Sequence, residues 1–81
     1  MDIVRAQHDD AGALQAVGAA IRSLRKGKGL SQEELSHRSS IDRSHMGRIE
    51  RGERNLSILN LLRISQGLAC PPSEILRKAG F

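Results

Sequence analysis

Aromatic side chains are almost absent from this sequence. Among its 81 residues there is no Trp and no Tyr, and Phe81 is the single aromatic residue. The core must therefore be built from Leu, Ile, Val and Met, whose spacing along the chain favours helices over a β-sandwich. A chain of this length lies near the lower limit for one core without disulfides or metals, so we expect one all-helical domain.

Cysteine is scarce too, since Cys70 is the only one. One thiol excludes an intramolecular disulfide framework and a zinc site built from several cysteines, and it fits a reducing compartment. Long apolar runs are lacking and the first ten residues are acidic, so we expect neither a membrane span nor a signal peptide. The sequence therefore predicts a protein of the cytoplasm.

Motifs that would carry catalysis are missing as well. The chain has no P-loop, no paired carboxylate site and no His/Cys cluster with metal-ligand spacing. Its three histidines, His8, His37 and His45, are scattered along the sequence. We therefore expect no enzyme activity, no metal, no cofactor and no small-molecule ligand.

Basic charge is concentrated in the middle of the chain. The formal net charge is +4, and residues 22–54 hold nine of the thirteen Lys and Arg residues against five acidic ones. Each phosphate that Lys or Arg neutralises releases condensed counterions, so a basic centre is typical of nucleic-acid binding. A solvated helix face can be equally basic, so the charge alone does not establish nucleic-acid binding, and the sequence motifs are needed.

The apolar pattern divides the chain into an arm and a domain. Residues 1–12 are polar and lack periodicity, so we expect a flexible N-terminal arm there and a single helix-turn-helix domain over residues 13–81. A first helix should run from about Ala13 to Lys26 and end at the following glycines. Its apolar stripe is formed by Val17, Ile21 and Leu24.

Two short helices are expected next, with a tight turn between them. Ser31 and Glu34 have the spacing of a capping box, which begins a helix that should end near Ser39. Asp42 is a good N-cap for the following helix, which should end near Gly52. This arrangement of two short helices around a turn is a helix-turn-helix.

Two further helices complete the predicted all-α, five-helix fold. Ser57 should cap the fourth helix, and Pro71-Pro72 suit the first turn of the fifth. The side chains expected to face inward are Ile58, Leu61, Ile64 and Leu68 in the fourth helix and Ile75 and Leu76 in the fifth.

The segment LSQEELSHRSSIDRSHMGRIERG, residues 30–52, resembles the helix-turn-helix of the Cro and phage-repressor family. It has the Ser-Gln opening, an Ile-Glu-Arg-Gly ending, and apolar residues at the matching core positions, namely Leu35, Ile41, Met46 and Ile49. The resemblance extends from about Val17 to Leu76 and implies a compact lambda-repressor-like DNA-binding domain.

Two positions depart from the family pattern. Ser36 stands where the family usually has alanine, and Ser40 stands where it has a glycine in the turn. Ser36 can hydrogen-bond to its own helix backbone. A left-handed Ser40 would cost on the order of 1 kcal/mol relative to glycine.

In such a motif the second helix lies in the major groove and the first crosses above the phosphate backbone. The face opposite Met46 and Ile49 carries Arg43, Ser44, Gly47 and Arg48. We expect Arg43 and Arg48 to contact bases. Because an arginine fork matches guanine O6 and N7, each half-site should contain guanine. Ser44 and His45 are expected to touch a base or a phosphate, the alternative being that they are merely solvated.

The resemblance also implies residues that bind the DNA backbone. Gln32, at the start of the first helix of the motif, is expected to hold a phosphate together with the helix N-terminus. Ser31, Arg51, Arg54 and Asn55 flank the same track. The alternative for Arg51 and Arg54 is a purely solubilising surface.

A structural ion pair is implied between Arg25 and Glu50. A carboxylate near the end of a helix is disfavoured by the helix dipole, so Glu50 needs a partner. In similar repressors an arginine at the end of the first helix forms a buried pair with this glutamate. We therefore assign Arg25 and Glu50 to structure rather than to DNA recognition.

The whole domain looks like the controller proteins of restriction-modification systems. The resemblance rests on the Asp-Arg-Ser start of the third helix and on the loop Glu-Arg-Gly-Glu-Arg-Asn-Leu-Ser, whereas His45 stands where those proteins have tyrosine. It implies a homodimer that binds a pseudo-palindromic operator, represses its own gene at high occupancy and activates transcription at low occupancy through contact with RNA polymerase.

Surplus apolar residues on the last two helices offer a dimer interface, for which we expect Leu59, Leu62 and Ile75. The alternative is that Leu59 and Leu62 belong to a wide inward face. Two other functions stay open, namely a small phage-type repressor or antitoxin and, from a different class, a protein-interaction module without DNA binding. Arg43 and Arg48 on the outward face argue against the last of these.

Overall fold

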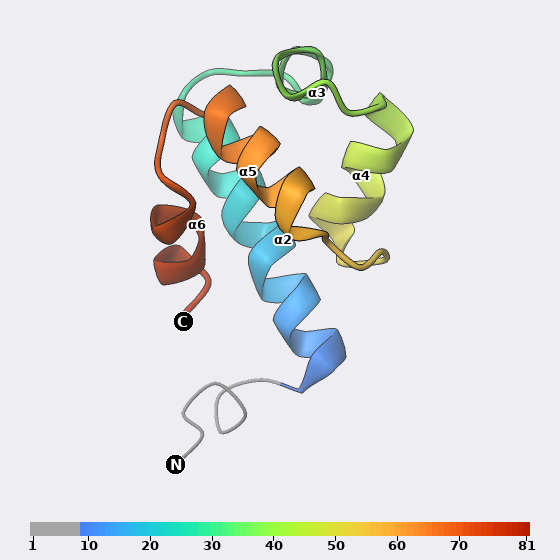
Figure 1. The fold of residues 1–81 in the computed structure, drawn as a ribbon, viewed down its shortest axis with the longest axis vertical. Helices are drawn as coiled ribbons and strands as arrows, with labels where there is room; N and C mark the ends of the chain where they lie inside the picture. The colour runs from blue at the N-terminus through green and yellow to red at the C-terminus, as the bar shows by residue number, and fades with distance from the viewer. Residues whose placement is uncertain (1–8) are drawn as a thin grey trace.

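Five helices make up the part of the chain that the structure describes, residues 9–81, and that part contains no strand (Figure 1). The structure is a computed structural model. In chain order the helices are α2 (Asp10–Gly27), α3 (Gln32–Ser39), α4 (Arg43–Arg51), α5 (Ile58–Gly67) and α6 (Pro72–Lys78). The predicted all-α, five-helix fold is confirmed.

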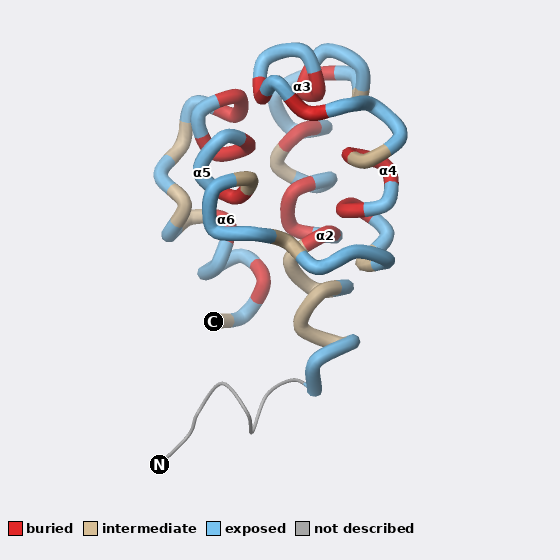
Figure 2. Tube along the Cα trace, turned by 45° about the vertical axis from the view of Figure 1, so that its right-hand side comes forward, coloured by how far each residue is buried: buried red, intermediate tan, exposed pale blue. Residues whose placement is uncertain are grey.

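The long helix α2 is the centre of the arrangement (Figure 1). It packs against α4 on one side and α6 on the other, while α3 packs against both α4 and α5. In Figure 2 the buried segments of these helices face a common interior. Each of the five helices contributes one of the large fully buried side chains, and Leu68 at the C-cap of α5 adds a sixth; the set is Ile21, Leu35, Met46, Ile64, Leu68 and Ile75.

Side-chain caps fix where the helices begin. The Ser31 hydroxyl accepts a hydrogen bond from the Glu34 backbone N–H at 3.0 Å, and the Glu34 carboxylate accepts from the Ser31 N–H at 2.8 Å. These two bonds confirm the capping box. The hydrogen bond from the Ser31 backbone N–H to the Glu34 carboxylate is the largest cause that lowers the pKa of Glu34. Ser57 caps α5 in the same way by accepting from the Asn60 N–H at 3.0 Å.

The turn between α3 and α4 accommodates both serines that depart from the family pattern. Ser40 is left-handed, with φ 56° and ψ 40°, as expected for a residue that replaces glycine there. The Ser36 hydroxyl donates to the Gln32 carbonyl at 2.7 Å, which confirms the predicted bond to its own helix. The Ile41 N–H closes the turn by donating to the Ser36 carbonyl at 3.0 Å.

The expected start of the first helix is wrong by three residues. Helix α2 begins at Asp10 rather than Ala13, because the Asp9 side chain accepts a hydrogen bond from the Gly12 N–H and caps it. Residues 10–12 are therefore helical and do not belong to an arm. Residues 1–8 of the predicted arm lie outside the described residues.

Two of the residues expected to face inward do not. Ile58 is 73% exposed and Leu76 is 36% exposed. In α5 the buried stripe includes Leu61, Ile64 and Ser65, so the inner face turns away from Ile58 at the first position of the helix. In the short α6 the buried pair is Ile75 and Ala79, one turn apart, and Leu76 lies to one side of it.

Helices α2 and α4 approach closely at Gly18. A Cβ atom at this position would lie 2.5 Å from the Glu50 carbonyl oxygen and would also collide with the Ile49 carbonyl oxygen. Since both obstacles are backbone atoms, they cannot swing aside. The absence of a side chain at Gly18 is therefore what allows α4 to lie directly against α2.

We predict that Gly18→Ala destabilises the domain by roughly 1 to 3 kcal/mol or more, because the added methyl group forces α2 and α4 apart. Gly27→Ala is the matched control, since nothing lies within 4 Å of a Cβ built at that helical position. It should be neutral or stabilising by up to about 1 kcal/mol. Urea denaturation followed by far-UV circular dichroism measures both, and equal midpoints would contradict the close-contact argument.

Candidate nucleic-acid interface

The helix-turn-helix is formed by α3 and α4, and α4 has two distinct faces. Met46 and Ile49 are buried against the core, at 0% and 2% exposure, as predicted. Arg43, Ser44 and Arg48 are exposed, and His45 is half-buried. All four residues expected to contact DNA from this helix therefore lie on α4, and three of them are exposed.

Gly47 was expected on this outward face, but the structure shows that it is buried. A Cβ atom there would lie 3.2 Å from Arg51 Nη1 and 3.4 Å from Gln32 Oε1. The side chains of Gln32 and Arg51 thus cover Gly47. They can do so because glycine leaves room for the N-terminus of α3 to lie close to α4.

Asp42 organises the first turn of α4. Its Oδ2 atom accepts hydrogen bonds from the Ser44 N–H at 3.1 Å and the His45 N–H at 3.4 Å, as the predicted N-cap, and also from the Ser44 hydroxyl. These bonds lower the pKa of Asp42, with the Ser44 hydroxyl as the largest cause. The carboxylate therefore stays ionised and occupies the N-terminus of α4.

The basic side chains around α4 differ in how free they are. Arg43, Arg48, Arg54 and Asn55 are exposed and make no side-chain hydrogen bond or ion pair with another described residue. Arg51 is instead paired with Glu53, through Nε–Oε2 at 2.8 Å and Nη2–Oε1 at 3.2 Å. Both side chains of this pair are more than half exposed, so a phosphate group can compete with Glu53 for the guanidinium.

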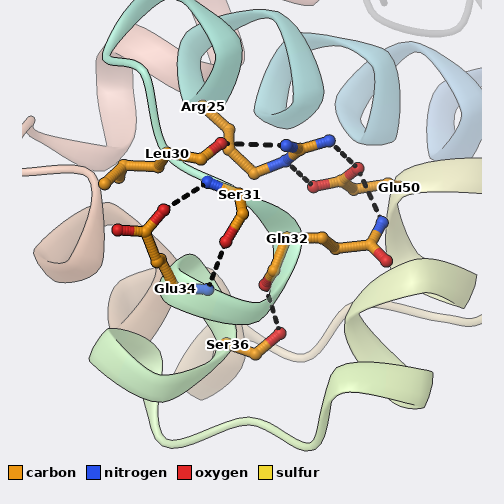
Figure 3. A network of polar contacts seen from close by, with 7 residues as sticks. All are labelled: Arg25, Leu30, Ser31, Gln32, Glu34, Ser36 and Glu50. Carbon is orange, nitrogen blue, oxygen red and sulfur yellow. Dashed lines mark hydrogen bonds and ion pairs between the residues drawn. The ribbon is translucent and has the colours of Figure 1, made fainter.

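The ion pair expected between Arg25 and Glu50 is present and buried (Figure 3). Arg25 Nε donates to Glu50 Oε2 at 2.8 Å and Nη2 donates to Oε1 at 3.1 Å, while the side chains are 10% and 3% exposed. Arg25 Nη1 also donates to the Leu30 carbonyl at 3.0 Å. One guanidinium thus ties the end of α2 to the entrance of α3 and the end of α4.

Gln32 was expected to hold a phosphate, and the structure gives it a second role. Its Nε2 atom donates to Glu50 Oε1 at 3.0 Å, which joins it to the buried ion pair (Figure 3). An amide nitrogen carries two protons, so one N–H of Gln32 is left for a phosphate. Ser31 is exposed beside it, but its hydroxyl already accepts the capping bond.

A hollow of about 360 Å³ lies beside this network, between α2, α3 and α4. Arg22 lines it and is exposed, yet no pattern in the sequence distinguishes this residue from the other basic ones. Only the packing of α2 on α4 brings Arg22 to the same hollow as Arg51. The lining residues are Arg22, Arg25, Gln32, Gly47, Glu50 and Arg51.

The residues expected at a dimer interface divide into two groups. Leu59 and Leu62 are exposed, at 57% and 40%, which excludes the alternative that they belong to a wide inward face. Ile75 was wrongly included, because it is fully buried in the core at 0% exposure and cannot reach a partner. Ile58, on the same exposed side of α5, is a residue that the sequence pattern had assigned to the core.

The described helices include none that is long and apolar enough to cross a membrane.

We predict that Glu50→Gln destabilises the domain by roughly 3 to 5 kcal/mol, because it leaves the buried Arg25 charge without its counterion. Glu53→Gln is the matched control, since it removes the same charge from the exposed pair with Arg51 and should change the free energy of unfolding far less. Urea unfolding of the two variants beside the wild type tests the difference. Similar losses in both would mean that the buried pair has no special structural role.

Comparison with known proteins agrees with this geometry. A family model described as helix-turn-helix matches residues 21–75. Control protein C.MunI from a Mycoplasma species is 42% identical over 59 residues, which cover 72% of this chain and 80% of that protein. Neither the family nor this relative is described as an enzyme.

Solved structures share the fold as well. The restriction-modification controller protein C.AhdI from Aeromonas hydrophila has a TM-score of 0.75 and 45% identity, covering 76% of this chain and 94% of that one. The clp gene regulator ClgR from Corynebacterium glutamicum has a TM-score of 0.80 and 30% identity, covering 83% and 87%. This chain belongs to the helix-turn-helix family and is a relative of the control proteins of restriction-modification systems.

Proposed function

We propose that this protein is a sequence-specific DNA-binding transcriptional regulator, the control protein of a restriction-modification system. The observation that carries the proposal is the outer face of α4, where Arg43 and Arg48 are exposed and make no side-chain hydrogen bond or ion pair with another described residue. Their donors are free on the helix that such a motif inserts into the major groove. The likeness to control proteins supports the finer assignment.

Base contacts would come from the start and middle of α4. Arg43 and Arg48 each present a planar fork that matches guanine O6 and N7, a contact that discriminates by about 1 to 3 kcal/mol. Ser44 and His45 lie beside Arg43 at the end of the helix that points toward base edges. Guanine is therefore expected in each half-site.

Backbone contacts would come from the residues around that helix. Arg54 and Asn55 are exposed and unpaired among the described residues, Gln32 has one free N–H, and Arg51 can exchange Glu53 for a phosphate. Ser31 lies at the same edge of α3. Such contacts set the register of the protein on the duplex without selecting a sequence.

A second copy of the chain would supply the second half-site. The exposed face of α5 carries Ile58, Leu59 and Leu62, which are 73%, 57% and 40% exposed. Leu62 lies four residues after Ile58 and three after Leu59, so its side chain neighbours both of them on the helix surface. A contiguous apolar face of this kind suits a two-fold interface, in which each copy presents the same patch. Two α4 helices about one turn of DNA apart would then bind a pseudo-palindromic operator.

Regulation would follow from operator occupancy in the bacterial cytoplasm. At low occupancy the bound dimer would contact RNA polymerase and activate transcription, and at high occupancy it would repress its own gene. Three of the relatives carry the name control protein, which supports a regulatory role. The chain itself would carry out no reaction, and its activity would consist of binding.

DNA binding is tested by fluorescence anisotropy with the DNA upstream of the protein's own gene and with a random duplex of equal length, at two salt concentrations. We predict selective, salt-sensitive binding to the upstream DNA, because phosphate neutralisation releases counterions. Failure to bind either duplex would contradict the proposal and favour a protein-interaction module.

Base and backbone contacts are separated by two variants. We predict that Arg43→Ala narrows the preference for operator over random DNA by roughly 1 to 3 kcal/mol. Asn55→Ala is the comparison, because losing a backbone contact should weaken binding to both duplexes about equally. A uniform loss in both variants would show that Arg43 does not contact a base.

The dimer is tested by placing a charge on the α5 face. We predict that Leu59→Glu shifts the protein from dimer to monomer in sedimentation velocity and weakens operator binding, because burying a carboxylate in an apolar interface is unfavourable. Ser23→Glu adds the same charge at an exposed position of α2 and should leave the dimer intact. A dimeric Leu59→Glu protein would place the interface elsewhere.

A further inference from the structure

The Ser44 hydroxyl has a fixed polarity in this structure. Its oxygen lies 2.5 Å from Asp42 Oδ2, the same carboxylate oxygen that accepts the Ser44 N–H at 3.1 Å. An ionised carboxylate carries no proton and can only accept hydrogen bonds. The hydroxyl proton of Ser44 must therefore point toward Asp42.

Asp42 is held in its ionised form by the same contacts. The bonds from the Ser44 hydroxyl and from the first-turn N–H groups lower the pKa of Asp42. A hydrogen bond to an ionised acceptor is stronger than one between neutral groups. Turning the Ser44 proton outward would break this charge-assisted bond. The Ser44 hydroxyl therefore stays oriented with its proton toward Asp42.

A serine hydroxyl has one proton and two acceptor lone pairs. With the proton held by Asp42, the exposed Ser44 oxygen offers only lone pairs to whatever approaches α4. A phosphate oxygen has no proton to give, so Ser44 in this state is a poor ligand for the DNA backbone. A group that donates a hydrogen bond is required.

We propose that Ser44 selects an exocyclic amino group in the major groove, cytosine N4 or adenine N6, and rejects a keto oxygen at the same position. This inference rests on the proposed DNA-binding function. Guanine O6 and thymine O4 would face the Ser44 lone pairs with lone pairs of their own. Cytosine and adenine instead supply the N–H that the oxygen needs.

Arg43, next to Ser44, requires hydrogen-bond acceptors on the DNA rather than donors. Arg43 carries only donors and matches the acceptors of guanine, whereas Ser44 carries only acceptors toward the groove. Each base pair displays one amino and one keto group in the major groove, on opposite strands. Ser44 therefore determines which strand carries the amino base beside the guanine that Arg43 contacts.

The experiment is a binding selection from a duplex library randomised across the whole site, carried out with the wild type, Ser44→Ala and Ser23→Ala. Ser23 is an exposed serine of α2 and serves as the control. We expect the wild type and Ser23→Ala to enrich guanine with an A or C at one neighbouring position on a given strand. Ser44→Ala should keep the guanine and lose the choice of A or C over G or T by roughly threefold to tenfold, the worth of one hydrogen bond.

Base analogues then test the amino group itself in the enriched sequence. Purine replaces adenine, or 2-pyrimidinone replaces cytosine, so that the exocyclic amino group alone is removed. The wild type should lose roughly threefold to tenfold in affinity, and Ser44→Ala should lose nothing further, so that the double-mutant cycle shows coupling. The cycle also cancels any effect of the analogue on the duplex.

The outcomes separate this inference from the function on which it rests. A wild-type protein that enriches no sequence would overturn the proposed function and this inference with it. A wild type that enriches a site in which Ser44→Ala keeps the amino base would overturn the role of Ser44 alone. Additive losses in the double-mutant cycle would do the same.

Discussion

The bidentate contact between Arg25 and Glu50 is the interaction on which the rest of this structure depends. Glu50 lies at the C-terminal end of α4, where the helix dipole opposes a negative charge. Arg25 offsets that charge from the end of α2, and Gln32 adds a further donor from the start of α3. Because a guanidinium fork is planar and directional, it fixes how the three helix ends are turned relative to one another.

The close approach of α2 to α4 brings Arg25 within reach of Glu50, and the ion pair in turn fixes how α4 is oriented on α2. Gly18 allows α2 and α4 to touch through their backbones, and Gly47 leaves room for Gln32 above α4. A buried ion pair contributes little net stability compared with apolar packing, but breaking it from one side is costly. In a domain with so few helices, its effect is to hold α4 at one rotation, with Met46 inside and Arg43 and Arg48 outside.

The sequence was most informative where structure is decided locally. The caps at Ser31, Asp42 and Ser57 follow from hydrogen bonds over two or three residues, and each is found where the pattern placed it. The ion pair could be anticipated only because a family resemblance linked Arg25 to a glutamate 25 residues away. The cap at Asp9 was overlooked because the polar, glycine-containing stretch after it resembles a loop.

Long-range packing decided what the sequence could not reveal. Apolar periodicity identifies a stripe on α5 and α6 but not its edges, so Ile58 and Leu76 were placed inside. Ile75 was assigned both to the inner face and to the dimer interface, and its full burial agrees only with the inner face. The edge depends on which neighbours cover the helix. The engagement of Gln32 with Glu50 and the position of Arg22 at the hollow likewise appear only once the helices are packed.

The exposed pair of Arg51 and Glu53 has a consequence for competition from the rest of a genome. Non-specific DNA binding is driven by unpaired basic side chains, each of which replaces a condensed counterion. Arg51 is already satisfied by a carboxylate of its own chain, so it adds less to the attraction for arbitrary DNA than Arg43, Arg48 or Arg54 does. An Arg51 contact to a phosphate carries no sequence information, so displacing Glu53 weakens binding to an operator and to arbitrary DNA alike. Glu53 therefore reduces how much of the protein is held on the rest of a genome, and it lowers operator affinity by about the same factor.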